Sequence, residues 1–385
     1  MNNSKAHLNN EAPSAFPGKL LFAVVLCALF LLLLVCVRPG AAEAKQAQAV
    51  ADFSGRFSSL VNNLESDAMS DLVYIKKVYS IPEEASVAPK PSRSCFGETT
   101  DPAVISAVID SAAELLDGQS TVWSPDIQLY DGSTVQYYCD DTILSIVWKE
   151  VVGRTVFTFA EVKIADGSQL RRALAGDSYS SSIQLHASEM ASAVNAVTAI
   201  NGDFYAFRKV GVVVYRRNLE RFEPSSLDTC FFTASGDMLF THRNELTSPE
   251  SARQFIEDNG VLFSASFGPI LVEDGEVCQV WDYPVGEIMT EYARSAIGMT
   301  GDRHYLLMAT SSELDIRYMP GVFVSTAAQI MHDRGCIKAY ELDGGQTAEI
   351  VHNNVPANAI VYGSERIMSD ILYFATAIPE EEAIG

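Results

Sequence analysis

Short apolar runs that end in turn residues fill most of the chain after residue 130, and their alternation predicts β-strands. Many runs are bounded by Asp-Gly, Ser-Gly or Glu-Asp-Gly, which favours antiparallel or mixed pairing, with hairpin turns expected in "SGDMLF" (235–240) and "EDGEV" (273–277). Helical spacing is rarer and predicts helices at 101–118, 188–196 and 325–334, capped by Asp101 and Ser325 in the first and last. The pattern therefore predicts an α+β domain with a mixed β-sheet and flanking helices.

An uninterrupted apolar run, Leu20–Val37, precedes this region and is long enough to predict a membrane-spanning helix. No second run of this kind follows, so the simplest topology is a single-pass anchor in the cell membrane with an extracytoplasmic C-terminal domain. Small residues around Ala42 and Ala44 leave cleavage and secretion open as the alternative.

Proline-rich composition and the position of the motifs predict the domain boundaries. The segment "SIPEEASVAPKPSRS" (80–94) has three prolines and few large apolar residues, which indicates a linker before the main domain. The resulting organisation is a cytoplasmic segment (1–19), the span (20–37), a stem and linker (38–95), an N-terminal α/β subdomain (96–186) and the main domain (187–379).

The net charge of the 385-residue chain is −22, with a pI near 4.6, which argues against nucleic acid as a partner. An anionic ligand would need a local group of arginines. Of seven cysteines, two lie in the apolar run, and no pair of the other five has CxxC spacing. The histidines are scattered, so neither a metal site nor a disulfide framework is indicated.

Four segments share one arrangement, in which an apolar strand ends in glycine beside a polar or charged residue. They are "AINGDFY" (199–205), "ASFGPILV" (265–272), "ARSAIG" (293–298) and "YELDGGQT" (340–347). Glycine at a strand end lets a ligand approach the backbone closely, although each segment taken singly is also typical of a plain turn.

These segments, together with "STAAQIMHDRGCIKAYELDGGQTAEIV" and "GSERIMSDILYFA", resemble the phosphodiester glycosidase family, whose bacterial members are often related to exopolysaccharide biosynthesis. The resemblance covers roughly residues 187–376. It implies hydrolysis of sugar-1-phosphodiesters such as N-acetylglucosamine-1-phosphate linked to another alcohol. This chemistry needs a cation at the phosphate and a carboxylate that activates water or stabilises an oxocarbenium-like centre.

The resemblance supports Asp343 as base, nucleophile or sugar anchor, and Asp203 is a second candidate carboxylate. Glu341 is a third, because on a strand it shares a face with Asp343, although the family does not usually have an acid at this position. Arg294 and Arg366 are the predicted phosphate clamps, and glycines are expected to offer backbone N–H groups and room for the ligand. The remaining predicted substrate-binding residues are Asn201, Gly202, Gly268, Pro269, Gly344, Gly345, Gln346 and Thr347.

Other interpretations of the same residues stay open. Asp203 and Asp343 are also suited to capping turns, and Arg294 to a surface ion pair with Glu291 or Asp302. Three functions follow: a hydrolase of cell-surface sugar-1-phosphodiesters, a catalytically silent glycan-binding protein of exopolysaccharide assembly, and a structural envelope protein. The expected partners are a cell-surface glycan or sugar-phosphate polymer and the membrane. No cofactor is predicted, and a divalent cation is left open.

Overall fold

The computed structural model describes residues 79–223, 227–284, 289–311 and 321–379. All of them belong to one compact unit, Lys77–Gly385. No helix in these ranges is long and apolar enough to cross a membrane. The predicted span Leu20–Val37 and the stem before Tyr79 lie outside the described residues, so they remain predictions.

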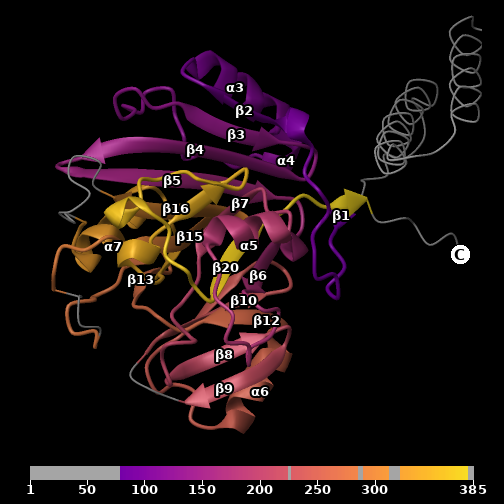
Figure 1. The fold of residues 1–385 in the computed structure, drawn as a ribbon, viewed down its shortest axis with the longest axis vertical. Coiled ribbons are helices and arrows are strands. Elements are labelled where there is room, and N and C mark those ends of the chain that lie inside the picture. The colour runs from indigo at the N-terminus through magenta and orange to yellow at the C-terminus, as the bar shows by residue number, and fades with distance from the viewer. Residues whose placement is uncertain (1–78, 224–226, 285–288, 312–320, 380–385) are drawn as a thin grey trace, which may run out of the picture. The chain divides into compact units, whose positions relative to one another are not determined.

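A nine-stranded sheet forms the largest layer of the unit (Figure 1). Helices α3 (Pro102–Ser111), α4 (Ala113–Leu116) and α7 (Val324–Asp333) contact this sheet. The strands, in spatial order, are β14 (Glu276–Val277), β13 (Ile270–Glu273), β17 (Lys338–Glu341), β15 (Ser295–Gly301), β16 (His304–Ser311), β5 (Thr155–Ile164), β4 (Ile143–Val152), β3 (Val135–Cys139) and β2 (Phe96–Thr99).

A five-stranded sheet forms the second layer, and α5 (Ala187–Ala193) contacts three of its strands. Its spatial order is β19 (Val355–Pro356), β18 (Ile350–His352), β7 (Thr198–Asn201), β20 (Asp370–Phe374) and β6 (Leu170–Leu174). The smaller elements are the sheet β11 (Met238–Thr241), β10 (Thr229–Thr233) and β12 (Val261–Ala265), the hairpin β8 (Gly211–Tyr215) and β9 (Asn218–Glu223), the pair β1 (Tyr79–Ser80) and β21 (Ile378–Pro379), and α6 (Pro249–Asp258).

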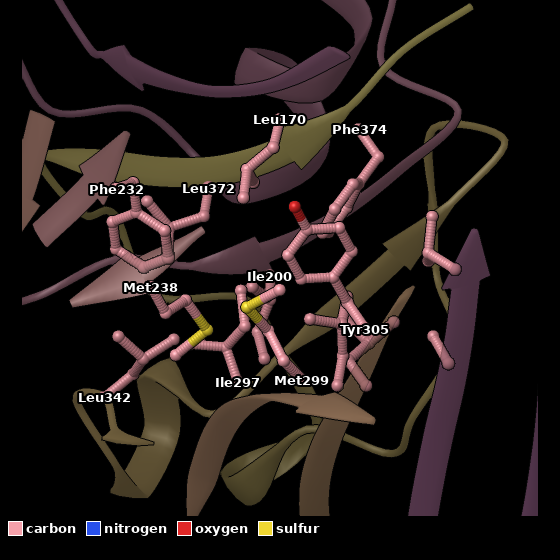
Figure 2. Packing of buried hydrophobic residues seen from close by; sticks show 14 of the residues in the cluster. Leu170, Ile200, Phe232, Met238, Ile297, Met299, Tyr305, Leu342, Leu372 and Phe374 are labelled. Atoms are coloured by element: carbon pink, nitrogen blue, oxygen red, sulfur yellow. The ribbon is translucent and has the colours of Figure 1, made fainter. Parts of the chain in front are cut away.

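The main core lies between the two large sheets, because alternate residues of each strand point into the space between them. Figure 2 shows Ile200 and Leu372 of the five-stranded sheet beside Ile297 and Tyr305 of the nine-stranded sheet. A second cluster fills the outer face of the nine-stranded sheet under α3, α4 and α7. A third fills the space between the five-stranded sheet and α5. The two sheets are thus held face to face, and their strand ends carry the polar residues of interest.

Several predicted elements are confirmed. The hairpins at 235–240 and 273–277 connect β10 to β11 and β13 to β14, and Asp101 caps α3 by accepting a hydrogen bond from the N–H of Ala103. The helix predicted at 101–118 is divided into α3 and α4 at Ala112. The N-cap of α7 is Phe323, two residues before the predicted Ser325, and the helix begins at Val324.

The α+β class is confirmed, but the predicted mixed β-sheet is not found, since the strand pairs that the structure describes are all antiparallel. Strands from both sides of residue 186 share sheets. β5 pairs with β16 in the nine-stranded sheet, and β6 pairs with β20 in the five-stranded sheet. This arrangement brings residues of 96–186 next to the predicted site.

Candidate active site

Asp343 lies just beyond the end of β17, where neighbouring strands hold its backbone. Its N–H donates to the carbonyl of Gly202 over 3.3 Å, and its carbonyl accepts from Asn201 Nδ2 over 2.8 Å. The short 3-10 turn Gly345–Thr347 follows and brings the Thr347 hydroxyl to Asp343 Oδ2 at 2.8 Å. Three contacts therefore fix the position and direction of this carboxylate.

The charge of Asp343 is balanced between opposing effects. Burial raises its pKa to about 6, while the Thr347 hydrogen bond and the guanidinium groups of Arg208 and Arg366 act to lower it. The side chain still keeps partial solvent exposure. Asp343 is thus mostly ionised at neutral pH and close enough to neutrality to take up a proton, which is what a general base requires.

Two arginines and an aromatic wall form the outer side of this site. The guanidinium carbon of Arg208 lies 4.3 Å from the ring centroid of Phe267 and 5.9 Å from that of Phe204. Arg366 stacks over Phe204 and Phe207, at 5.9 and 5.8 Å, and the two phenylalanine rings stack on each other with centroids 4.6 Å apart. Arginines held against aromatic faces keep their N–H edges available for an anion.

Arg208 is the residue that the sequence analysis missed. Its Nη1 is buried and has no hydrogen-bond partner within the described residues. A buried cationic donor without an acceptor is costly, so this atom is suited to receive an oxygen from a ligand. The signal was present in the sequence, because Arg208 follows "NGDFY" by three residues, but single arginines in loops are too common to select one.

Asn201 acts inside the protein instead of holding a sugar hydroxyl or acetamido group. Its Nδ2 donates to the carbonyls of Asp343 and Gly202, and its Oδ1 accepts from Ser295 Oγ and the N–H of Glu349. These four hydrogen bonds use the full capacity of an amide side chain. Asn201 therefore ties β7, β15 and the Asp343 segment together.

Asp203 belongs to a buried ionic cluster beneath the site. Its Oδ1 accepts from Arg172 Nη2 at 2.9 Å and from the N–H of Tyr205, and its Oδ2 accepts from the N–H of Ser266 at 2.7 Å. Arg172 also bonds Asp370 through Nε at 2.9 Å. Burial and the nearby Asp203 raise the pKa of Asp370, against the opposing effect of Arg172. With both oxygens engaged, Asp203 positions the strand end and does not face a ligand.

Arg294 and Glu341 form a second buried pair, behind Asp343. Arg294 is only 3% exposed and lies 3.4 Å from Glu341 Oε1, so the predicted surface pair with Glu291 or Asp302 is wrong. The Nε and Nη2 of Arg294 donate to backbone carbonyls, which also argues against the predicted phosphate clamp. Burial and the nearby Asp343 charge raise the pKa of Glu341 to about 7, opposed by Arg294.

The four predicted ligand-facing glycines make room for protein atoms instead. A Cβ on Gly202 would lie 1.8 Å from Asp370 Oδ2, and one on Gly268 would lie 2.2 Å from the Tyr283 hydroxyl. A Cβ on Gly344 would meet the carbonyl of Ala293, and one on Gly345, whose φ is +67°, would meet the Tyr292 ring. The N–H groups of Gly268 and Gly345 are also occupied, by the carbonyls of Glu341 and Ala293. Close packing of strand ends therefore explains these glycines.

The remaining predicted residues support the same turn. Gln346 Nε2 donates to the carbonyl of Ser364 at 3.1 Å, which joins the turn after Asp343 to the loop that carries Arg366. Pro269 follows a cis peptide bond, and its carbonyl accepts from the N–H of Glu341 at 3.1 Å. No group of three or more His, Cys, Asp or Glu side chains suited to a metal ion occurs among the described residues.

Glu349 and Glu365 form an unpredicted carboxyl pair beside the site. Glu349 is fully buried, and the neighbouring Glu365 and burial raise its pKa to about 9. Glu365 accepts from the N–H and the hydroxyl of Ser188, at 3.0 and 2.7 Å. Glu349 is thus neutral at physiological pH and lies near Glu365, the residue next to Arg366.

The fold and the site together define a hydrolase-type centre, with one carboxylate of tuned pKa facing two arginines. Residues 194–375 match the family of phosphodiester glycosidases. Residues 194–375 therefore form a phosphodiester glycosidase domain, and this domain supports a glycosidase-type enzyme. A comparison with curated proteins finds no match.

Two of the solved structures that resemble this chain illustrate the likeness. One is the zebrafish N-acetylglucosamine-1-phosphodiester α-N-acetylglucosaminidase catalytic domain, auto-inhibited by its pro-peptide, at 16% identity and a TM-score of 0.47, covering 66% of this chain and 86% of that one. The other is a hypothetical protein from Synechocystis, at 14% identity and a TM-score of 0.46, covering 63% and 64%. Because both TM-scores are below 0.5, we draw no argument from either likeness.

Proposed function

We propose that this protein is an extracytoplasmic hydrolase that cleaves sugar-1-phosphodiesters, of the N-acetylglucosamine-1-phosphate kind, in cell-surface polysaccharide. The observation that carries the proposal is the juxtaposition of Asp343 with Arg208 and Arg366. A carboxylate with a pKa near 6 suits the activation of water, and two arginines suit a phosphate that gains charge as it leaves.

The proposed reaction breaks the bond between the anomeric carbon and the phosphate oxygen. Water attacks the anomeric carbon, its proton passes to Asp343, and the electron pair of the broken bond leaves with the phosphate. The products are a free sugar and a phosphomonoester of the second alcohol. Arg208 and Arg366 stabilise the additional negative charge on that phosphate, so a strong general acid is not needed.

Five further residues act by position in this proposal, in three roles. Asn201 and Thr347 hold Asp343 in place. Asp203 fixes the segment after β7, where the carbonyl of Gly202 accepts from the N–H of Asp343. Glu341 and Arg294 form the buried wall behind the carboxylate. None of the three roles requires contact with substrate, so their substitution should change stability or the pKa of Asp343 before it changes substrate affinity.

The cellular setting of the proposal rests on the sequence. The apolar run Leu20–Val37 favours a single-pass anchor in the cell membrane, with secretion after cleavage as the alternative. Either arrangement gives the enzyme access to surface glycans or sugar-phosphate polymers.

A labelled-water experiment tests the proposal. The full chain is incubated in H₂¹⁸O with the p-nitrophenyl ester of N-acetylglucosamine-1-phosphate, and the products are analysed by mass spectrometry. We expect ¹⁸O in the sugar and release of p-nitrophenyl phosphate. Label in the phosphate, with free p-nitrophenol, would instead define a phosphoesterase. Saturable glycan binding without turnover would favour the catalytically silent alternative.

A further inference from the structure

A cavity of about 390 Å³ lies away from Asp343, along the outer edge of β6. All eight consecutive residues from Leu170 to Asp177 line it, so the cavity follows the strand itself. β6 is the edge strand of the five-stranded sheet, with β20 on its other side. No proline interrupts the strand, and its register with β20 is continuous, so the ladder is regular over five residues.

The backbone groups that β6 presents to this cavity follow from its pairing with β20. The N–H of Ala175 donates to the carbonyl of Ser369, and the N–H of Ala375 donates to the carbonyl of Gln169. Residues 169, 171, 173 and 175 therefore bond toward β20, and the antiparallel ladder directs the groups of 170, 172 and 174 outward.

Leu170, Arg172 and Leu174 each direct one N–H and one carbonyl outward, which gives six groups. Two of these six are hydrogen-bonded to nearby residues. The N–H of Leu170 donates to the carbonyl of Gly167, and the carbonyl of Leu174 accepts from the N–H of Asp177. The other four have no hydrogen-bond partner in the described part of the chain: the carbonyl of Leu170, the N–H and carbonyl of Arg172, and the N–H of Leu174. They form an acceptor, donor, acceptor, donor row at strand spacing.

The walls on both sides of the row are mainly apolar. One wall comes from α5 and from the segment between β1 and β2 that carries Val87, and the other from β12 and the turn of the β8–β9 hairpin. The lining side chains used here are Val87, Met190, Val194, Leu262 and Phe263. Arg172 itself points to Asp203 and Asp370, so its charge is neutralised inside the protein and does not enter the cavity.

We propose that this groove binds an extended peptide segment of another protein by β-strand addition. A second backbone is the ligand that matches alternating N–H and C=O groups at this spacing, and apolar walls accept its alternate side chains. An acyl chain would fit the walls but would leave four backbone groups without partners in an apolar space, and each would carry its desolvation penalty. The site goes beyond the proposed hydrolase function and is independent of it.

The test uses the full chain and the fluorescently labelled peptide acetyl-Thr-Val-Thr-Val-Thr-amide. We expect saturable binding by anisotropy, and at least tenfold weaker binding of the same peptide N-methylated at the two amides that would donate to Leu170 and Arg172. Val87→Asp, at a side chain 48% exposed in the groove, should weaken binding at least tenfold. Val355→Asp, 59% exposed at the opposite edge of the same sheet, should leave binding unchanged.

Hydrogen exchange distinguishes a groove that is open to a peptide from one that the chain itself already covers. The amides of Arg172 and Leu174 should exchange quickly in the free chain and at least tenfold more slowly with peptide bound. Protection of both amides before any peptide is added would show that the chain covers its own groove and would overturn the proposal. Equal binding of the parent and N-methylated peptides, competition by lauric acid alone, or no binding of the parent peptide would overturn it as well.

Discussion

Replacement of Glu349 by glutamine should make the protein more stable, and more so as the pH rises. Glu349 is fully buried, and neither carboxyl oxygen accepts a hydrogen bond from any described residue. Burial, and after it the neighbouring Glu365, raise its pKa to about 9, so the side chain is neutral in the native state. Glutamine has nearly the same shape and carries no charge at any pH.

The size of the effect follows from proton linkage. An unfolded glutamate has a pKa of about 4.3, so between roughly pH 5 and 8 the native state holds a proton that the unfolded state has released. The contribution of neutral Glu349 is fully present below the unfolded pKa and is lost as the pH rises through the native value. Over this window the free energy of unfolding of the wild type should fall by up to about 1.4 kcal/mol per pH unit from this one group.

Urea unfolding monitored by fluorescence at pH 6, 7 and 8 measures the difference. The advantage of Glu349→Gln over the wild type should grow by roughly 3 kcal/mol between pH 6 and 8, since two pH units each contribute about 1.4. Glu276→Gln, at an exposed position of β14, is the matched control and should give a curve parallel to the wild type. Parallel curves for Glu349→Gln would refute a protonated, buried Glu349.

Three further predictions concern the arginines and Thr347. Arg208→Met keeps an unbranched side chain against the aromatic rings but removes the charge. The kcat/KM for a sugar-1-phosphodiester should therefore fall roughly 10- to 100-fold, while the kcat/KM for an uncharged p-nitrophenyl glycoside should change little. Equal losses on both substrates would contradict phosphate recognition by Arg208. Thr347→Val removes a hydrogen bond that lowers the pKa of Asp343, so the acid limb of the pH–rate profile should move to higher pH, and an unmoved limb would argue against Asp343 as the base. Arg172→Met leaves two buried carboxylates unpaired and should cost about 3–5 kcal/mol in urea unfolding, whereas a loss below about 1 kcal/mol would refute the ionic cluster.

Local patterns in the sequence predicted the parts of the site that depend on local structure. The strand end before Asp343, the hairpin at 273–277 and the cap at Asp101 follow from turn chemistry and apolar spacing, and they are confirmed. The family resemblance over residues 187–376 agrees with the matched range 194–375.

Contacts between distant segments could not be predicted in the same way. Arg172 lies in a region without a recognised motif, and only the pairing of β6 with β20 brings it to Asp203. The glycines were interpreted as space for a ligand because the sequence does not show that Tyr292 and Asp370 occupy that space. The sequence indicates Arg294 and misses Arg208, because burial distinguishes an internal arginine from one that faces a ligand, and burial depends on how the sheets pack.

The turnover number of Asp343→Asn tests the central claim most directly. With the p-nitrophenyl ester of N-acetylglucosamine-1-phosphate as substrate, the wild type should release the sugar. The variant should lose roughly 10²- to 10⁴-fold in kcat, because its amide cannot accept the proton of water. Its affinity for the substrate should change little, since Arg208 and Arg366 remain. A variant that keeps the wild-type rate would contradict the assignment of Asp343 as the catalytic base.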